Sequence, residues 1–310
     1  MLSKAKKLVP IIGIAILLYL VLEVGASNII NAMLGANVTY LMLAIVLVVP
    51  YLLLQTHKWW YIIRKLEGPL GFSYLLKIYI IGTFWSVITP GKIGTFSRIA
   101  YIKRKTGKDL GESSLSVVLD KMLDMFALFM LAIIGGVLLT GYVSGMMLVM
   151  MAVLFAAFIV MSALLMKKST SRALMRLVHR FILPQRFRSG AHKSFNSFYK
   201  SVPSIRRLVV PFVSTALSWI VIYSANHFVA LSLGIHVPWH IFVTLFPIAT
   251  IIGLIPITVS GWGTREAVLI GLLAPFAATA ESVIAMSILI FFMTGVPPAA
   301  LGAILSFSEK

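Results

Sequence analysis

Three carboxylates fall within or beside long apolar runs of the sequence, where ionised groups are rare and costly. Asp120 and Asp124 are four residues apart and therefore share one face of a helix, whereas Lys121 projects in a different direction. Glu266 follows a second apolar run. Because an unpaired carboxylate at membrane depth is costly, we expect these groups to pair with basic residues across the two halves of the chain. They are either static ion pairs or counter-ions and proton sites for a ligand.

The basic residues that could pair with them lie where apolar runs are broken by proline and glycine. The run 74–88 ends just before Pro90, and the run 242–257 contains Pro256. A helix broken at membrane depth frees backbone groups that lipid cannot satisfy, so each break must face protein or water. Glycine amides and half-helix N-termini there would suit a phosphate group. The candidate substrate-binding residues are Pro90, Gly91, Lys92, Gly94, Arg98, Gly261, Gly263 and Arg265, and the candidate counter-ion or coupling residues are Asp120, Lys121, Asp124 and Glu266.

The composition places these residues in a membrane protein. Of 310 residues, 60% are hydrophobic and only 12% are charged, about half the charged fraction of a soluble domain. The net charge of +18 is carried between the apolar segments, as the positive-inside rule expects of cytoplasmic loops. No nucleic-acid-binding motif accompanies it, and the absence of cysteine excludes disulfides and thiolate chemistry. The sequence therefore predicts an all-α polytopic membrane protein.

The distribution of basic residues predicts the topology. Lys and Arg lie on both sides of the run 74–88, so both flanks should be cytoplasmic. The roughly 30 residues between these flanks are too few for two spans of about 20 residues each. We therefore expect a re-entrant helical hairpin at about 70–102, entered from the cytoplasm, and a second at about 241–281, entered from outside. The six predicted full spans are 8–22, 39–55, 114–140, 146–166, 209–233 and 282–306.

The order of span, span, hairpin and span occurs twice, with opposite orientation. We interpret residues 1–142 as a first repeat and residues 143–310 as an inverted second repeat. In such folds the binding site lies near the midplane, where the two hairpins meet. Both termini should be cytoplasmic. The run 8–22 also resembles a signal peptide, but we expect it to be retained as the first span.

Two basic segments are expected at the membrane surface. Residues 167–207 contain eleven Lys or Arg and no acid, and apolar residues recur there at helical spacing. This pattern favours an amphipathic helix on anionic inner-leaflet lipids within the cytoplasmic segment 167–208, with a solvated loop as the alternative. The aromatic and basic stretch 57–61, which includes Lys58 and Trp59, is typical of an interface anchor.

No other constellation indicates catalysis. His227, His236 and His240 lack a carboxylate or cysteine nearby, so we expect no metal site. The Gly-Trp-Gly sequence at 261–263 has no preceding strand and no Walker lysine, so it is not a nucleotide loop. No Ser/His/Asp arrangement is recognisable. We therefore expect neither catalytic residues nor a cofactor.

Three motifs together resemble the lysylphosphatidylglycerol synthase transmembrane family, also called flippase-like or UPF0104 membrane proteins. The first is Pro-Gly-x-x-Gly-x-x-x-Arg at 90–98, the second is Asp-Lys-x-x-Asp at 120–124, and the third is Gly-Trp-Gly-Thr-Arg-Glu-Ala at 261–267. The resemblance implies a domain that translocates polar lipids. In the lipid-aminoacylating relatives, a soluble aminoacyl-transferase domain follows it. Because this chain ends at Lys310, directly after its last span, we expect a stand-alone member that does not synthesise lysyl lipid.

The leading hypothesis is a lipid flippase of the cell (cytoplasmic) membrane. A polar lipid, anionic or phosphate-containing, would place its headgroup in a midplane cavity against Lys92, Arg98 and Arg265. The sequence contains no ATP-binding motif, so a lipid gradient, an ion gradient or the membrane potential would drive transport. The alternatives are an ion-coupled small-solute transporter and a membrane-embedded lipid-modifying transferase. We expect no nucleic-acid partner, and a homo-oligomer is an open alternative to a monomer.

Overall fold

Helices account for the regular structure in the part of the chain that the computed structural model describes. The described residues are 22–66, 68, 70–139, 141, 143–166, 170, 197–199, 202–254 and 263–308, and no strand occurs among them. Four described stretches are long and apolar enough to cross a membrane: Val38–Arg64, Gly145–Met166, Arg206–Ser232 and Ala280–Phe307. The protein is an all-α polytopic membrane protein, as predicted.

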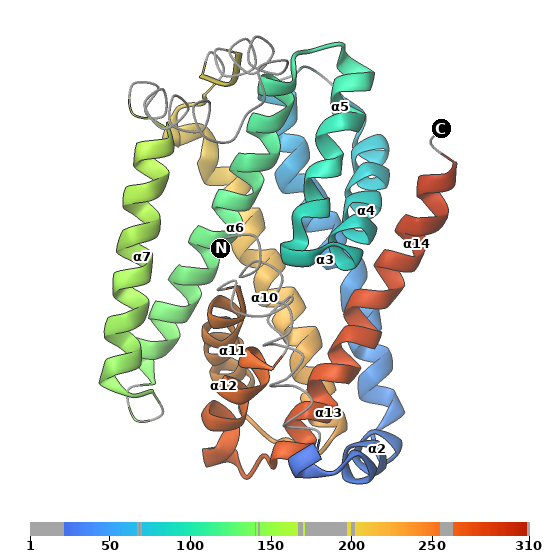
Figure 1. Ribbon diagram of the computed structural model, residues 1–310, viewed down its shortest axis with the longest axis vertical. Coiled ribbons are helices and arrows are strands. Elements are labelled where there is room, and N and C mark those ends of the chain that lie inside the picture. Colours follow the sequence, from blue (N-terminus) through green and yellow to red (C-terminus); the bar gives the residue numbers. More distant parts are fainter. Residues whose placement is uncertain are drawn as a thin grey trace, which may run out of the picture.

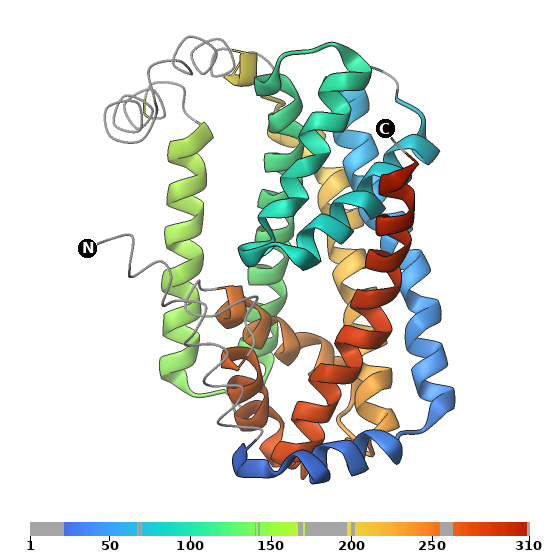
Figure 2. The same ribbon diagram turned by 45° about the vertical axis from the view of Figure 1, so that its right-hand side comes forward.

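The long helices run beside one another along the long axis of the molecule (Figure 1). They are α3 (Val38–Leu66), α6 (Leu110–Leu138), α7 (Gly145–Met166), α10 (Val209–Ser232) and a composite last span of α13 (Ala280–Ile290), the π-helical turn η5 (Phe291–Gly295) and α14 (Val296–Phe307). The short helix α2 (Ala26–Leu34) lies across one end of the bundle and packs on α13 (Figure 2). The predicted first span lies outside the described residues, except for its last residue.

Two helical hairpins enter the bundle from opposite ends and stop about halfway along it (Figure 2). The first hairpin consists of α4 (Phe72–Ile88), the 3-10 helix η1 (Pro90–Ser97) and α5 (Arg98–Thr106). The second consists of α11 (Trp239–Leu254), α12 (Thr264–Leu273) and η4 (Ala274–Phe276), and the segment that joins α11 to α12 lies outside the described residues. The assignment of two inverted repeats, and of the side from which each hairpin enters, stays a prediction.

The turn of the first hairpin is built by local contacts. Thr89 leaves the helical conformation (φ −106°, ψ 137°), as expected before a proline, and Pro90 begins η1. The Thr89 hydroxyl donates to the Trp85 carbonyl oxygen at 2.7 Å and accepts the Gly94 N–H at 2.7 Å. Lys92 has a left-handed backbone (φ 57°), which is uncommon outside glycine and typical of a tight turn. The sequence therefore fixes where the hairpin turns.

Helix α14 packs closely on α4 of the first hairpin at Gly302. We expect Gly302→Ala to lower the midpoint of thermal unfolding in detergent, because a Cβ there would lie 2.3 Å from the Ile80 carbonyl oxygen. The helices would have to separate, at the cost of about 1–3 kcal/mol that is typical of overpacking. Gly271→Ala is the matched control, because no atom lies within 4 Å of its added Cβ. An equal fall in both variants would contradict this packing.

Candidate functional site

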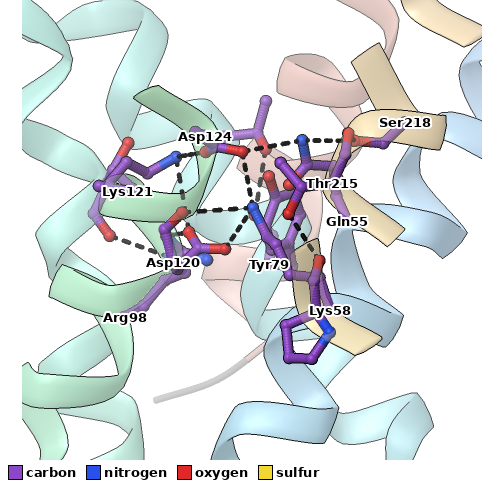
Figure 3. Close-up of polar contacts among 12 residues, drawn as sticks. Gln55, Lys58, Tyr79, Arg98, Asp120, Lys121, Asp124, Thr215 and Ser218 are labelled. Atoms are coloured by element: carbon purple, nitrogen blue, oxygen red, sulfur yellow. Dashed lines mark hydrogen bonds and ion pairs between the residues drawn. The ribbon is translucent and has the colours of Figure 1, made fainter. Parts of the chain in front are cut away.

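A buried cluster of ions joins α3, α5 and α6 (Figure 3). The Lys58 ammonium lies 2.6 Å from Asp120 Oδ1 and 2.7 Å from Asp124 Oδ1, and all three side chains are buried. Asp124 is the middle residue of α6, fourteen residues from either end of Leu110–Leu138. Asp120 and Asp124 therefore both lie near the middle of α6. We call Lys58, Arg98, Asp120, Lys121 and Asp124 the buried ion cluster.

Arg98, the first residue of α5, is held by contacts on several sides. Its Nη2 donates to Asp120 Oδ2 at 2.7 Å and its Nε donates to the Thr95 carbonyl oxygen at 3.2 Å. The guanidinium carbon lies 4.6 Å from the ring centre of Trp59 and 4.9 Å from that of Tyr79, which is favourable cation–π geometry. With only 1% of the residue exposed, Arg98 orients Asp120 and does not face an opening.

Lys121 connects the buried ions to an open side of the cluster. Its ammonium lies 2.9 Å from Asp124 Oδ2 and 3.5 Å from Asp120 Oδ2. The prediction that Lys121 points away from these carboxylates is therefore wrong, because a long lysine side chain can bend back along its helix. It is also the most exposed member of the buried ion cluster, since 38% of its side chain is accessible.

A pair of hydrogen bonds fastens the cluster to the second half of the chain. Gln55 Nε2 donates to Asp124 Oδ1 at 3.3 Å and to the Ser218 hydroxyl of α10 at 3.0 Å. One turn along α10, the Ser214 hydroxyl lies 3.0 Å from His57 Nδ1. Because α3 and α10 pack along their length, these polar contacts set the register between the two helices.

The charges of the second hairpin pair with each other. Glu266 is fully buried, and its Oε1 accepts from Arg265 Nη2 at 2.8 Å and from Arg265 Nε at 3.0 Å. Its Oε2 accepts the Gly263 N–H at 2.6 Å. The expected ion pairing across the two halves is therefore wrong for Arg265 and Glu266, which satisfy each other at the start of α12. The Gly263 and Gly94 amides, which were candidate donors to a phosphate, already donate to protein oxygens.

Three cations lie in the turn of the first hairpin, in the middle of α6 and at the start of α12. The Lys92 side chain is exposed and lies within electrostatic range of Arg265, Lys121 and Asp124. Arg265 is also accessible, with 23% of its side chain exposed. We call Lys92, Lys121 and Arg265 the tip cluster. It contains one candidate residue from each hairpin.

The remaining candidate residues belong to neither the tip cluster nor the buried ion cluster. Pro90 and Gly91 begin η1, and Gly261 lies outside the described residues. Among the described residues, no group of three His, Cys, Asp or Glu side chains could hold a metal ion.

The sequence did not indicate Lys58 as a site residue. Its pattern predicted that Lys58 belongs to an aromatic and basic anchor at the membrane interface. That prediction is wrong for Lys58 and Trp59, because neither is exposed. The available signal was the spacing of Gln55 and Lys58, which are three residues apart and therefore share a face of α3. Tyr79, which covers Arg98, gave no signal beyond its place in an apolar run.

The fold and the site define a class: polytopic helical membrane proteins with two opposed mid-depth hairpins around buried ion pairs. The model of the lysylphosphatidylglycerol synthase TM region matches residues 8–302. The chain belongs to this family, as its motifs predict.

Three relatives are UPF0104 membrane proteins of archaea. Two are from Methanothermobacter thermautotrophicus: one is 25% identical over 279 residues, covering 84% of this chain and 82% of the relative. The other is 24% identical over 318 residues, covering 94% and 90%. The third, from Methanocaldococcus jannaschii, is 23% identical over 310 residues, covering 95% and 92%. The residues matched by the family model, 8–302, include both hairpins.

Proposed function

We propose that the protein is a lipid flippase that translocates a lipid with an anionic, phosphate-containing headgroup. The observation that carries this proposal is the tip cluster, in which Lys92 lies within electrostatic range of Lys121 and of Arg265, each on a separate element. Like charges within this range repel one another, and the repulsion is strong where water is scarce. An anion bound between them would remove that repulsion.

The charge balance of the surrounding residues supports an anionic ligand. The tip cluster and the buried ion cluster together contain five cations, and among the described residues their acidic partners are Asp120, Asp124 and Glu266. Two positive charges are therefore uncompensated in this region. Because charges at membrane depth are normally paired, an arriving phosphate would supply what the protein itself does not.

A lipid fits this site better than a soluble solute for two reasons. The family is named for the membrane region of an enzyme that makes a lipid, lysylphosphatidylglycerol. The hairpins also stop halfway along the bundle, so a headgroup at their tips could lie at mid-depth while its acyl chains stay in the bilayer. Translocation would follow if the two halves rocked about this point.

The residues of the site would have distinct roles in this mechanism. Lys92, Lys121 and Arg265 contact the headgroup. Asp124 and Glu266 hold Lys121 and Arg265 in place when the site is empty, and Arg98 positions Asp120 without touching the ligand. On this proposal the protein is a transporter and not an enzyme, and it resides in the cell membrane with both termini in the cytoplasm.

Translocation in proteoliposomes tests the proposal. We expect purified protein to move headgroup-labelled phosphatidylglycerol between leaflets faster than phosphatidylcholine. Lys92→Gln and Lys121→Gln should each slow this movement roughly tenfold, because each removes a charge-assisted hydrogen bond to the phosphate. Lys103→Gln, an exposed change on α5 away from the tips, is the control. Quenching of the outer-leaflet label with dithionite reports the rate.

The outcomes separate the candidate functions. Equal rates in wild type and both tip variants would remove the tip cluster from transport. If neither lipid moves faster than in empty liposomes but a soluble anion is taken up, the protein is a solute transporter. If the labelled lipid is chemically converted, it is a lipid-modifying transferase.

A further inference from the structure

A second feature of the first hairpin is a groove between the end of α4 and one face of α5. Its volume is about 320 Å³, and it is lined by Trp85, Ser97, Ala100, Tyr101 and Arg104. Ser97, the last residue of η1, and Ala100, Tyr101 and Arg104 of α5 follow the spacing i, i+3, i+4 and i+7, so they form one stripe. Ala100 and Arg104 are exposed and Trp85 is 37% exposed, so the groove is open along its length.

The chemistry of the groove changes from one end to the other. Arg104 lies in the last turn of α5, where Lys103 and Lys105 are also exposed. Ser97 lies about 10 Å deeper, at 1.5 Å per residue, and its buried hydroxyl has no hydrogen-bond partner in the described part of the chain. The indole of Trp85 lies at the hairpin tip. The groove therefore runs from a cationic end, past an unsatisfied hydroxyl, to an aromatic surface at mid-depth.

We propose that this groove binds one anionic glycerophospholipid lengthwise. Its phosphate would lie at Arg104, its glycerol would pass Ala100, its ester carbonyls would accept a hydrogen bond from the Ser97 hydroxyl, and an acyl chain would run on to Trp85. Each part of the lipid then meets a group of matching chemistry at matching depth. A soluble anion would use only the Arg104 end and would leave Ser97 unsatisfied. The site is separate from the tip cluster and does not depend on the proposed transport activity.

A bound lipid would also brace the turn that carries Lys92. Trp85 lines the groove, and its carbonyl oxygen accepts a hydrogen bond from the Thr89 hydroxyl. The same hydroxyl accepts the Gly94 N–H. Pressure of an acyl chain against Trp85 would therefore be transmitted to the turn. This gives the first hairpin a dependence on the lipid composition around it.

Native mass spectrometry of the detergent-purified protein tests the site, with phosphatidylglycerol and phosphatidylcholine as the probes. We expect wild-type protein to retain phosphatidylglycerol in preference to phosphatidylcholine. Arg104→Gln should lower the retained phosphatidylglycerol about fivefold, because it removes the charge beside the phosphate. Ala100→Trp should lower retention of both lipids, because it fills the groove. Lys103→Gln is the control, since it removes a charge from the same helical turn without lining the groove.

Equal losses in Arg104→Gln and Lys103→Gln would overturn the proposal, because they would show only a general attraction to basic residues. Unchanged retention in Ala100→Trp would overturn it as well. The tip-cluster variants Lys92→Gln and Lys121→Gln should keep the groove lipid. Loss of translocation with the groove lipid retained, or the reverse, therefore distinguishes a failure of the transport proposal from a failure of this one.

Discussion

Asp120→Asn is expected to destabilise the protein more than any other single change to its charged residues. Asp120 is shared by Lys58 at 2.6 Å and Arg98 at 2.7 Å, and neither cation is accessible to water. Asparagine keeps the shape of the side chain but removes its charge, which leaves two buried cations against Asp124 alone. Breaking a buried pair in this way costs about 3–5 kcal/mol. The melting temperature in detergent, followed by tryptophan fluorescence, should fall accordingly.

Glu112→Gln is the matched control for Asp120→Asn. Glu112 lies on the same helix and pairs with Lys108 at 3.5 Å, but both side chains are partly exposed, so the expected effect is small. A double-mutant cycle with Arg98→Met then measures the coupling. Because Arg98→Met removes one of the stranded cations, the double variant should lose less than the sum of the single changes. Additive losses of stability in the cycle would contradict the coupling of Asp120 and Arg98. Equal effects of Asp120→Asn and Glu112→Gln would contradict the importance of the buried ion cluster for stability.

The second large effect is expected at Gly94, in the turn of the first hairpin. An added Cβ would lie 2.0 Å from the Trp85 carbonyl oxygen and 2.6 Å from the Thr89 hydroxyl, so Gly94→Ala cannot keep the present turn. The turn is too short to relax by moving a whole helix, so the loss should reach the upper end of overpacking effects, about 3 kcal/mol. Because Lys92 is two residues away, lipid translocation should be lost together with stability.

Gly71→Ala, at the other end of α4, is the control for Gly94→Ala. No atom lies within 4 Å of a Cβ at Gly71, and its backbone (φ −62°, ψ 140°) suits any residue. Melting temperature and lipid translocation are measured for both variants. Wild-type behaviour of Gly94→Ala, or equal damage by Gly71→Ala, would show that the turn is not closed by Trp85, Thr89 and Gly94.

The backbone of the site was largely predictable from sequence. Proline and glycine act locally, so Pro90 and Gly94 mark the turn of the first hairpin without any knowledge of its neighbours. The spacing of Asp120 and Asp124 likewise places both carboxylates on one face of α6, where they share Lys58. These predictions depend only on helical geometry, which is a property of a short segment.

The partners of the charges were harder to predict, because pairing is decided by tertiary packing. Lys58 follows a long apolar run and is flanked by aromatic residues, a pattern that interface anchors and buried sites share. Only the approach of α6 to α3 buries it. The prediction for the Lys121 side chain was wrong for a different reason. Helical spacing sets the direction of the Cα–Cβ bond, but four further bonds decide where the ammonium lies. The predicted amphipathic helix within 167–208 lies mostly outside the described residues and stays a prediction.

The charges of α6 also bear on how the chain is made. This helix of 29 residues contains Asp120, Lys121 and Asp124, and it is not among the stretches apolar enough to qualify as spans by composition. Ribosomes synthesise proteins from the N-terminus, so Lys58 on α3 and Arg98 on α5 emerge before either acid. If α6 inserts after these segments, its acids meet counter-charges that are already present, which lowers the cost of inserting a charged segment. We therefore expect insertion of α6 to depend on the segments made before it.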